Sequence, residues 1–112
     1  MAKIIAKTAE KKPFIAKAQS KKYLEKVPET MVFWCHDGQI FHDINDLMVG
    51  FDIMTDETFL YHANDDKNDF SCWIVDIIGD GDLGKEIKKA KSRKHAKEFT
   101  KMRYSDLSKQ EG

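Results

Sequence analysis

The sequence lacks the features that would place it in a membrane or a secretory pathway. Among its 112 residues there is no apolar run near the ~18 that a membrane-spanning helix requires. No apolar segment follows the Lys-rich N-terminus, so no secretory signal is expected, and its basic residues are all Lys, which disfavours an Arg-rich transit peptide. We therefore expect a cytoplasmic protein that does not contact a membrane.

Residues for disulfides and metal sites are scarce. Cys35 and Cys72 are the only cysteines, too few for a disulfide framework, so both are expected to be reduced thiols. His36 and His42 have the interval of a zinc-binding His pair, but no Cys pair matches them. A calcium loop is not formed, because Gly84 stands where the third ligand belongs. No metal and no other cofactor is expected.

Catalytic signatures are missing as well. The chain has no Gly-rich phosphate loop, no nucleophile elbow and no paired-carboxylate motif. A Cys/His/Asp set can be drawn with Cys35 or Cys72 and His62, but almost any chain of this size permits one. The sequence therefore predicts a protein that is not an enzyme.

Charge is abundant but unevenly distributed. Residues 1–30 carry eight Lys against three Glu, residues 31–84 one Lys against twelve acids, and residues 85–112 ten Lys and Arg against four acids. The formal net charge of zero therefore hides an acidic centre between two basic ends.

The clearest helical pattern lies at residues 70–78. Its apolar positions follow the spacing i, i+3, i+4, i+7, i+8 and are Phe70, Trp73, Ile74, Ile77 and Ile78. Asp69 is expected to cap the start of this helix, and Gly79 to end it in a left-handed conformation. We predict that this helix lies at the centre of the core.

A hairpin and further helices are predicted around this central helix. Residues 31–42 suggest a β-hairpin around the turn dipeptide Asp37-Gly38, whose two-residue loop would place Trp34 opposite Phe41. Three more helices are expected behind capping residues: 44–54 behind Asp43, 56–63 behind Thr55 with Phe59 and Leu60 inward, and 83–103 behind Asp82. The predicted fold is α+β and mainly helical, with one N-terminal β-hairpin followed by three to four short helices and basic terminal extensions.

The predicted domain organisation follows the charge layout. Residues 1–30 form a flexible basic arm with a short helix at 15–26, residues 31–94 a compact helical domain with the hairpin, and residues 95–112 a basic helix end and a frayed tail. Two interpretations of the arm stay open, a disordered solubilising tail or a binding arm.

The basic ends are the strongest functional signal. Lys is a good point-charge partner for phosphate, and such segments bind nucleic acid by releasing counterions. We therefore expect an accessory binding protein that contacts nucleic acid or a nucleoprotein; a solvated face, or one that folds back on the acidic centre, is the alternative. The candidate contacts are Lys11, Lys12, Lys21, Lys22, Lys85, Lys88, Lys89, Lys91, Arg93, Lys94, Lys97, Lys101 and Arg103.

A second candidate site is the loop before the central helix, which is more acidic than a turn requires. Its candidate residues are Tyr61, His62, Asp65, Asp66 and Asn68. The alternative function is a protein–protein interaction module, whose acidic face around Asp65–Asp82 would meet a basic partner.

Residues 31–90 resemble a small prokaryotic domain family of uncharacterised function, found as short stand-alone proteins and as an accessory domain. The shared pattern is the Asp-Gly turn at 37–38, aromatic-x-Tyr-His at 59–62, Asn-Asp-Phe at 68–70 with Trp-Ile at 73–74 and Asp76, and Gly-Asp at 79–80 before Leu83. Gly84 departs from the Ala expected there. The resemblance implies a compact, mainly helical domain and no catalytic residue.

Overall fold

The computed structural model describes residues 16–111, and residues 1–15 and Gly112 lie outside the described part. Its first elements are α2 (Lys17–Leu24), the 3₁₀ turn η1 (Glu29–Met31), strands β1 (Phe33–Trp34) and β2 (Ile40–Phe41), and α3 (Ile44–Ile53). They are followed by α4 (Asp56–His62), α5 (Asp69–Trp73), its π-helical continuation η2 (Ile74–Ile78), α6 (Gly81–Lys89) and α7 (Arg93–Glu111). A mainly helical fold with a two-stranded antiparallel hairpin is confirmed, but the six α-helices of the described part exceed the three to four predicted.

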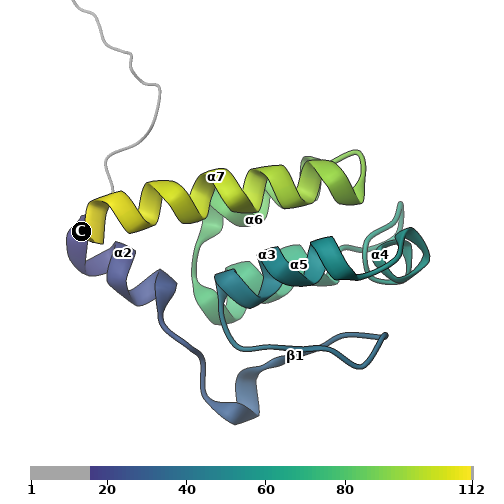
Figure 1. The fold of residues 1–112 in the computed structure, drawn as a ribbon, viewed down its shortest axis with the longest axis horizontal. Coiled ribbons are helices and arrows are strands. Elements are labelled where there is room, and N and C mark those ends of the chain that lie inside the picture. Colours follow the sequence, from purple (N-terminus) through teal and green to yellow (C-terminus); the bar gives the residue numbers. More distant parts are fainter. Residues whose placement is uncertain (1–15, 112) are drawn as a thin grey trace, which may run out of the picture.

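The long helix α7 lies across the other helices and packs against α2, α3 and α6 (Figure 1). It begins after Ser92, whose hydroxyl accepts the backbone N–H of His95 at 3.2 Å as an N-cap does. The preceding Ala90 is extended and ends α6. The predicted single helix over residues 83–103 is therefore wrong, because the chain reverses at this turn and folds α7 back over the body.

The packed body extends beyond the predicted boundaries at residues 30 and 94. Tyr23 and Leu24 of α2 pack against the core, and Leu107 near the end of α7 is fully buried. A segment of the predicted arm and a segment of the predicted tail thus pack together, which encloses the core from the side of α7.

The predicted central helix over residues 70–78 is present as α5 followed by η2. Gly79 ends it with φ 93°, as predicted, and donates its N–H to the carbonyl of Ile74 at 2.7 Å, the five-residue spacing of a π-helix. The predicted cap is displaced by one residue, because the side chain of Asn68, not that of Asp69, accepts a backbone N–H of the first turn. Asp69 is thereby left for a different partner.

The other helix caps show the same mixture of agreement and correction. Asp43 and Thr55 accept backbone N–H groups at the starts of α3 and α4, as predicted. Asp80, not Asp82, caps α6, because this helix begins two residues earlier than its apolar pattern indicates.

Two residues predicted to face the core are exposed instead. Ile77 is 36% exposed, because the wide turn of η2 shifts the helical spacing on which its prediction depended. Leu60 is 57% exposed, since the inner face of the short helix α4 is occupied by Phe59 and His62.

The hairpin register differs from the prediction by one residue. Phe33 pairs with Phe41 and Trp34 with Ile40, so the loop has three residues and ends at Gly38, whose φ is 95°. A slip of one residue exchanges the two faces of a strand. The two Phe rings therefore enter the core, while Trp34 is 70% exposed.

Two close contacts fix α5 against its neighbours. The indole N–H of Trp73 donates to the carbonyl of Met31 at 2.8 Å and ties η1, just before the hairpin, to α5. The hydroxyl of Ser71 donates to the carbonyl of Gly84 at 2.8 Å, and a Cβ at residue 84 would meet the side chain of Val75. Glycine at this position therefore lets α6 approach α5 closely.

Candidate functional site

His62 lies buried at the end of α4, against the rings of Phe33 and Phe70. Its Nε2 accepts the backbone N–H of His36 at 2.9 Å, and its Nδ1 lies 2.9 Å from a carboxylate oxygen of Asp69. A backbone N–H can only donate, so Nε2 is the acceptor and Nδ1 carries the proton. Both ring nitrogens are used within the protein, which leaves this His–Asp pair without a nitrogen that could take a proton from a substrate.

Asp69 joins His62 to the surface. Burial raises the pKa of the Asp69 carboxyl, but hydrogen bonds from His62 and Lys67 outweigh burial and hold the pKa below its ordinary value. The ammonium of Lys67 lies 3.0 Å from that carboxylate and 5.0 Å from the centre of the Tyr61 ring. Tyr61 is exposed and stacks on the ring of His36, with centroids 3.9 Å apart. We call these contacts the closed network, because the ring nitrogens of His62, the carboxylate of Asp69 and the ammonium of Lys67 all have partners within it.

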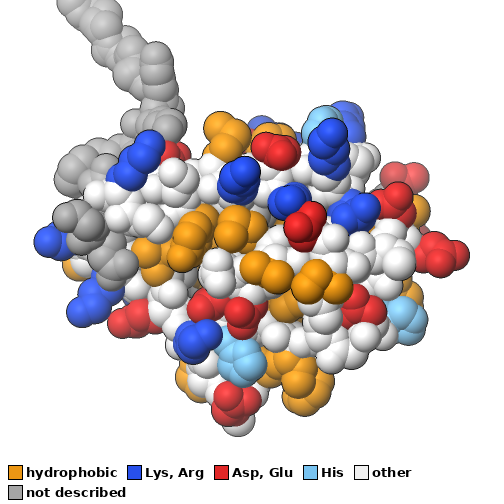
Figure 2. Space-filling view, viewed as in Figure 1, with side chains coloured by type: hydrophobic (Ala, Val, Ile, Leu, Met, Phe, Trp, Pro, Cys, Tyr) orange, Lys and Arg blue, Asp and Glu red, His pale blue; other side chains and the backbone are white. Residues whose placement is uncertain are grey.

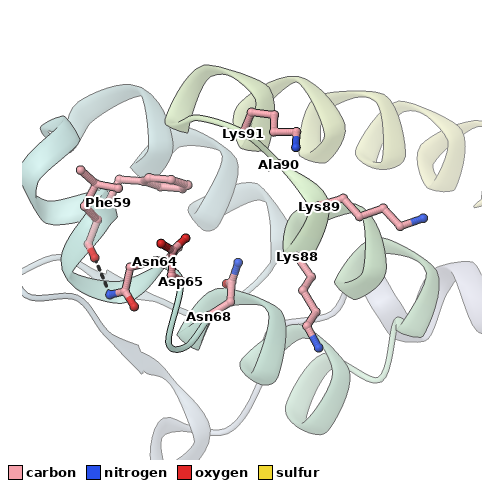
Figure 3. A pocket seen from close by; sticks show the side chains of 10 residues that line it. Phe59, Asn64, Asp65, Asn68, Lys88, Lys89, Ala90 and Lys91 are labelled. Atoms are coloured by element: carbon pink, nitrogen blue, oxygen red, sulfur yellow. Dashed lines mark hydrogen bonds between the residues drawn. The ribbon is translucent and has the colours of Figure 1, made fainter.

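An open cavity of about 610 Å³ lies between the end of α4, the loop at residues 63–68 and the end of α6 (Figure 3). We call it the corner cavity. Its polar lining consists of Asn64, Asp65, Asn68, Lys88, Lys89 and Lys91. An adjoining cavity of about 470 Å³ shares Asn64, Asp65, Asn68 and Lys88 with it, and Asp66 is among the residues that it adds.

The loop at residues 63–68 is fixed by its own side chains. The amide of Asn64 donates to the carbonyl of Leu60 at 2.8 Å and accepts a backbone N–H two residues on at 2.9 Å, while Asn68 caps α5. Asp65 makes no hydrogen bond or ion pair within residues 16–111, and its carboxylate points into the corner cavity (Figure 3). Asp65 is therefore the loop acid that remains available to a ligand in this cavity.

Three of the predicted nucleic-acid contacts form ion pairs with the acidic centre. The pairs are Arg93 with Asp56 at 2.8 Å, Lys97 with Asp52 at 2.9 Å and Arg103 with Asp80 at 2.7 Å. The last pair is bidentate and buried, with Asp80 only 1% exposed. Burial lowers the pKa of the Arg103 guanidinium, but the bonds to Asp80 outweigh burial and raise it above its ordinary value. These three cations hold α7 against the body.

The other predicted cations within residues 16–111 are exposed lysines that have no ion-pair partner there. They are Lys21, Lys22, Lys85, Lys88, Lys89, Lys91, Lys94 and Lys101. Lys11 and Lys12 lie outside the described residues. In Figure 2 many of the blue side chains follow the α7 side of the molecule, whereas red ones lie at the right-hand edge, on the side of α4, and along the lower part, with a few among the blue ones. The charge segregation of the sequence thus persists only in part on this face of the folded surface.

The two cysteines differ in their surroundings. Cys35 is buried, and burial raises the pKa of its thiol to about 11, so it stays protonated at neutral pH. Cys72 is exposed at the edge of the adjoining cavity. Within residues 16–111 no group of three or more His, Cys, Asp or Glu side chains is placed to hold a metal ion.

The predicted loop site divides into two parts in the structure. Tyr61 and His62 belong to the closed network, Asp65 and Asn68 line the corner cavity, and Asp66 lies in the adjoining one. The proximity of this loop to the lysines at the end of α6 was not predicted. The apolar lining of the corner cavity, which includes Ala63 and Ala90, carries no signal in the sequence, because residues of α4 and α6 line one cavity only in the folded chain.

No known protein family, curated protein or solved structure was found to match the chain. The resemblance to a small prokaryotic domain family therefore stays a prediction. In the described part of the chain, no helix combines the length and the hydropathy needed to cross a bilayer.

Proposed function

We propose that the protein is a non-enzymatic binding protein that contacts the phosphate backbone of nucleic acid through the lysines at the α6–α7 corner. The observation that carries this proposal is the division of the cations into two groups. Arg93, Lys97 and Arg103 are paired with acids of the body. The exposed lysines from Lys85 to Lys94 have no such partner within residues 16–111.

The unpaired lysines are the ones that can bind phosphate favourably. A cation already bridged to a carboxylate must give up that partner before it meets a phosphate, whereas a solvated lysine gives up only water. Each phosphate neutralised by a lysine releases about 0.7–0.9 condensed counterion, and this release drives non-specific binding. Lys88, Lys89 and Lys91 lie around one cavity and can contact successive phosphates of one strand.

Fluorescence anisotropy with a labelled single strand and a labelled duplex, each of about 20 nucleotides or base pairs, tests this at about 50 and 200 mM salt. Wild-type protein should bind at the lower salt and lose affinity steeply at the higher. Replacement of Lys88, Lys89 and Lys91 by Gln should weaken binding about tenfold and reduce the slope against log salt by about 2–3. Absence of binding of either polymer at the lower salt would contradict the proposal.

A matched control variant replaces three lysines on other parts of the surface, Lys17, Lys26 and Lys109, by Gln. This variant has the same net charge as the corner triple. Lys26 is bridged to Asp43 at 3.3 Å, but its side chain is 69% exposed, so the fold should tolerate the change. The control should keep most of the affinity, because the proposal depends on the position of the lysines and not on total charge.

The second candidate function is a protein interaction module with an acidic face. Asp66 and Asp76 favour it, since both are exposed and have no ion-pair partner within residues 16–111. Affinity capture with and without nuclease separates the two functions. A partner that survives nuclease and is lost from an Asp66→Asn/Asp76→Asn variant supports the acidic face, whereas a partner lost with nuclease supports nucleic acid.

A further inference from the structure

The corner cavity has the form of a site for one flat, polar-edged group. One wall is the fixed loop at residues 63–68, the opposite wall is the end of α6, and the apolar lining comes from Phe59, Leu60, Ala63 and Ala90 (Figure 3). Its volume of about 610 Å³ lies within the 300–1,000 Å³ range of small-ligand pockets. A hollow that offers apolar side chains between two polar walls suits a nucleobase, which has apolar faces and a hydrogen-bonding rim.

Asp65 determines which edge of a base would fit. Its carboxylate points into the cavity and has no partner within residues 16–111. An ionised carboxylate can only accept hydrogen bonds, so it favours an edge rich in donors. Guanine offers two adjacent donors, the N1–H and the 2-amino group. Uracil and thymine offer one N–H between two carbonyl oxygens, which a carboxylate repels.

The lysines at the rim supply the second half of the recognition. Lys88, Lys89 and Lys91 line the same cavity, and none has an ion-pair partner within residues 16–111. A base in the cavity would therefore bring its flanking phosphates within reach of these flexible side chains, of which Lys89 extends away from Asp65 in Figure 3. In a duplex the donor edge of guanine is already paired, so only an unstacked base of a single strand can enter.

We propose that the corner cavity binds one unstacked base of a single-stranded nucleic acid, with a preference for guanine over uracil or thymine. Asp65 accepts from the base edge, and the three rim lysines contact the flanking phosphates. This inference rests on the proposed function, because it requires that the lysines meet a nucleic acid. RNA and DNA share the base chemistry, and separate experiments with the two polymers distinguish them.

The test compares oligonucleotides of about 12 residues at about 50 mM salt, where phosphate contacts are strongest. One RNA strand is all uridine, and a second RNA strand carries a single guanosine at its centre. The same two strands are made in DNA with thymidine in place of uridine. A duplex that contains the guanosine strand completes the set. Wild-type protein should bind the strand with one guanosine about tenfold more tightly than the uniform strand and more tightly than the duplex.

Asp65→Ala should reduce this preference to less than about twofold, whereas Asp66→Ala should retain it. The two variants have the same net charge, so any general gain in phosphate attraction is the same in both and leaves the ratio of affinities unchanged. Equal binding of the guanosine and uniform strands by wild-type protein overturns the cavity proposal, as does a preference that survives Asp65→Ala. Absence of binding by every oligonucleotide overturns the proposed function itself, so the two failures are distinguishable.

Discussion

The closed network around His62 and the corner cavity lie on the two sides of one short loop, and they differ in what their charged groups contact. On the closed side Asp69 is held by His62 and Lys67. On the open side Asp65 has no partner within residues 16–111, although it is only four residues away. The difference shows that the acidity of the loop has two separate causes. Asp69 stabilises the fold, and only the remaining acids can serve a ligand.

The cations likewise fall into two groups, those paired with an acid of the protein and those without an ion-pair partner in the described residues. Arg103 is fixed by two bonds to a buried carboxylate, while Lys88 and Lys89 at the end of α6 are exposed and unpaired within the described residues. Charge alone therefore predicts neither role. If the comparison holds, substitutions on the closed side should reduce stability, and substitutions on the open side should change binding only.

The largest expected effect comes from Asp80→Ala, because it leaves the guanidinium of Arg103 without its carboxylate and also removes the cap of α6. Breaking one partner of a buried ion pair destabilises by about 3–5 kcal/mol. Urea unfolding followed by far-UV circular dichroism measures the change. Asp82→Ala is the control, since Asp82 lies 3.9 Å from Arg103 and its side chain is 61% exposed, and it should cost less than about 0.5 kcal/mol.

His62→Ala should have the next largest effect. The substitution removes a buried ring from the aromatic cluster and leaves the backbone N–H of His36 without its acceptor, for a combined loss of about 2–4 kcal/mol. The free energy of unfolding in urea again measures it. Asp65→Ala, on the other side of the loop, should change stability by less than about 0.5 kcal/mol. Comparable losses in the two variants would contradict the division into a closed and an open side.

The smallest effect concerns pH. Because the pKa of Asp69 is lowered in the folded protein, its contribution to stability is complete above its unfolded value near 3.8 and is lost as the pH falls through the folded value. Asp69→Asn should therefore be less stable than wild type at pH 6, and the gap should narrow below pH 4. The gap should stay under about 1 kcal/mol, since the side chain is 36% exposed and water screens it. Urea titrations at a series of pH values measure this difference in the free energy of unfolding. A difference that widens in acid would contradict the prediction.

Sequence patterns predicted the parts of the fold that local geometry controls. The caps Asp43 and Thr55 and the left-handed Gly79 were predicted correctly, because each depends on the backbone of its own neighbours. The hairpin was predicted, but its register was not, since a three-residue loop and a two-residue loop around Gly38 suit the same dipeptide. The buried positions of Phe33 and Phe41 decide between them only after the core has formed.

The candidate site was also predicted only in part, because local sequence patterns do not show which distant residues come together. The sequence indicated an unusually acidic loop and a run of lysines, and both are present on the surface. It could not indicate that Asp65 and Lys88 line one cavity, because residues far apart in the chain are brought together by the packing of α6 on α5. It also gave no sign that Asp80 and Arg103 pair with each other.

The sequence by itself determined the secondary structure around the central helix, the segregation of charge and the absence of familiar catalytic motifs. These features depend on composition and on spacings of a few residues. Tertiary structure alone decided which charges are available. The fold back of α7 pairs Arg93, Lys97 and Arg103 with acids of the body and leaves the lysines of the corner in water. Whether a charged group stabilises the fold or meets a ligand depends on what lies within a few ångströms of it, and that distance is fixed only when the helices pack.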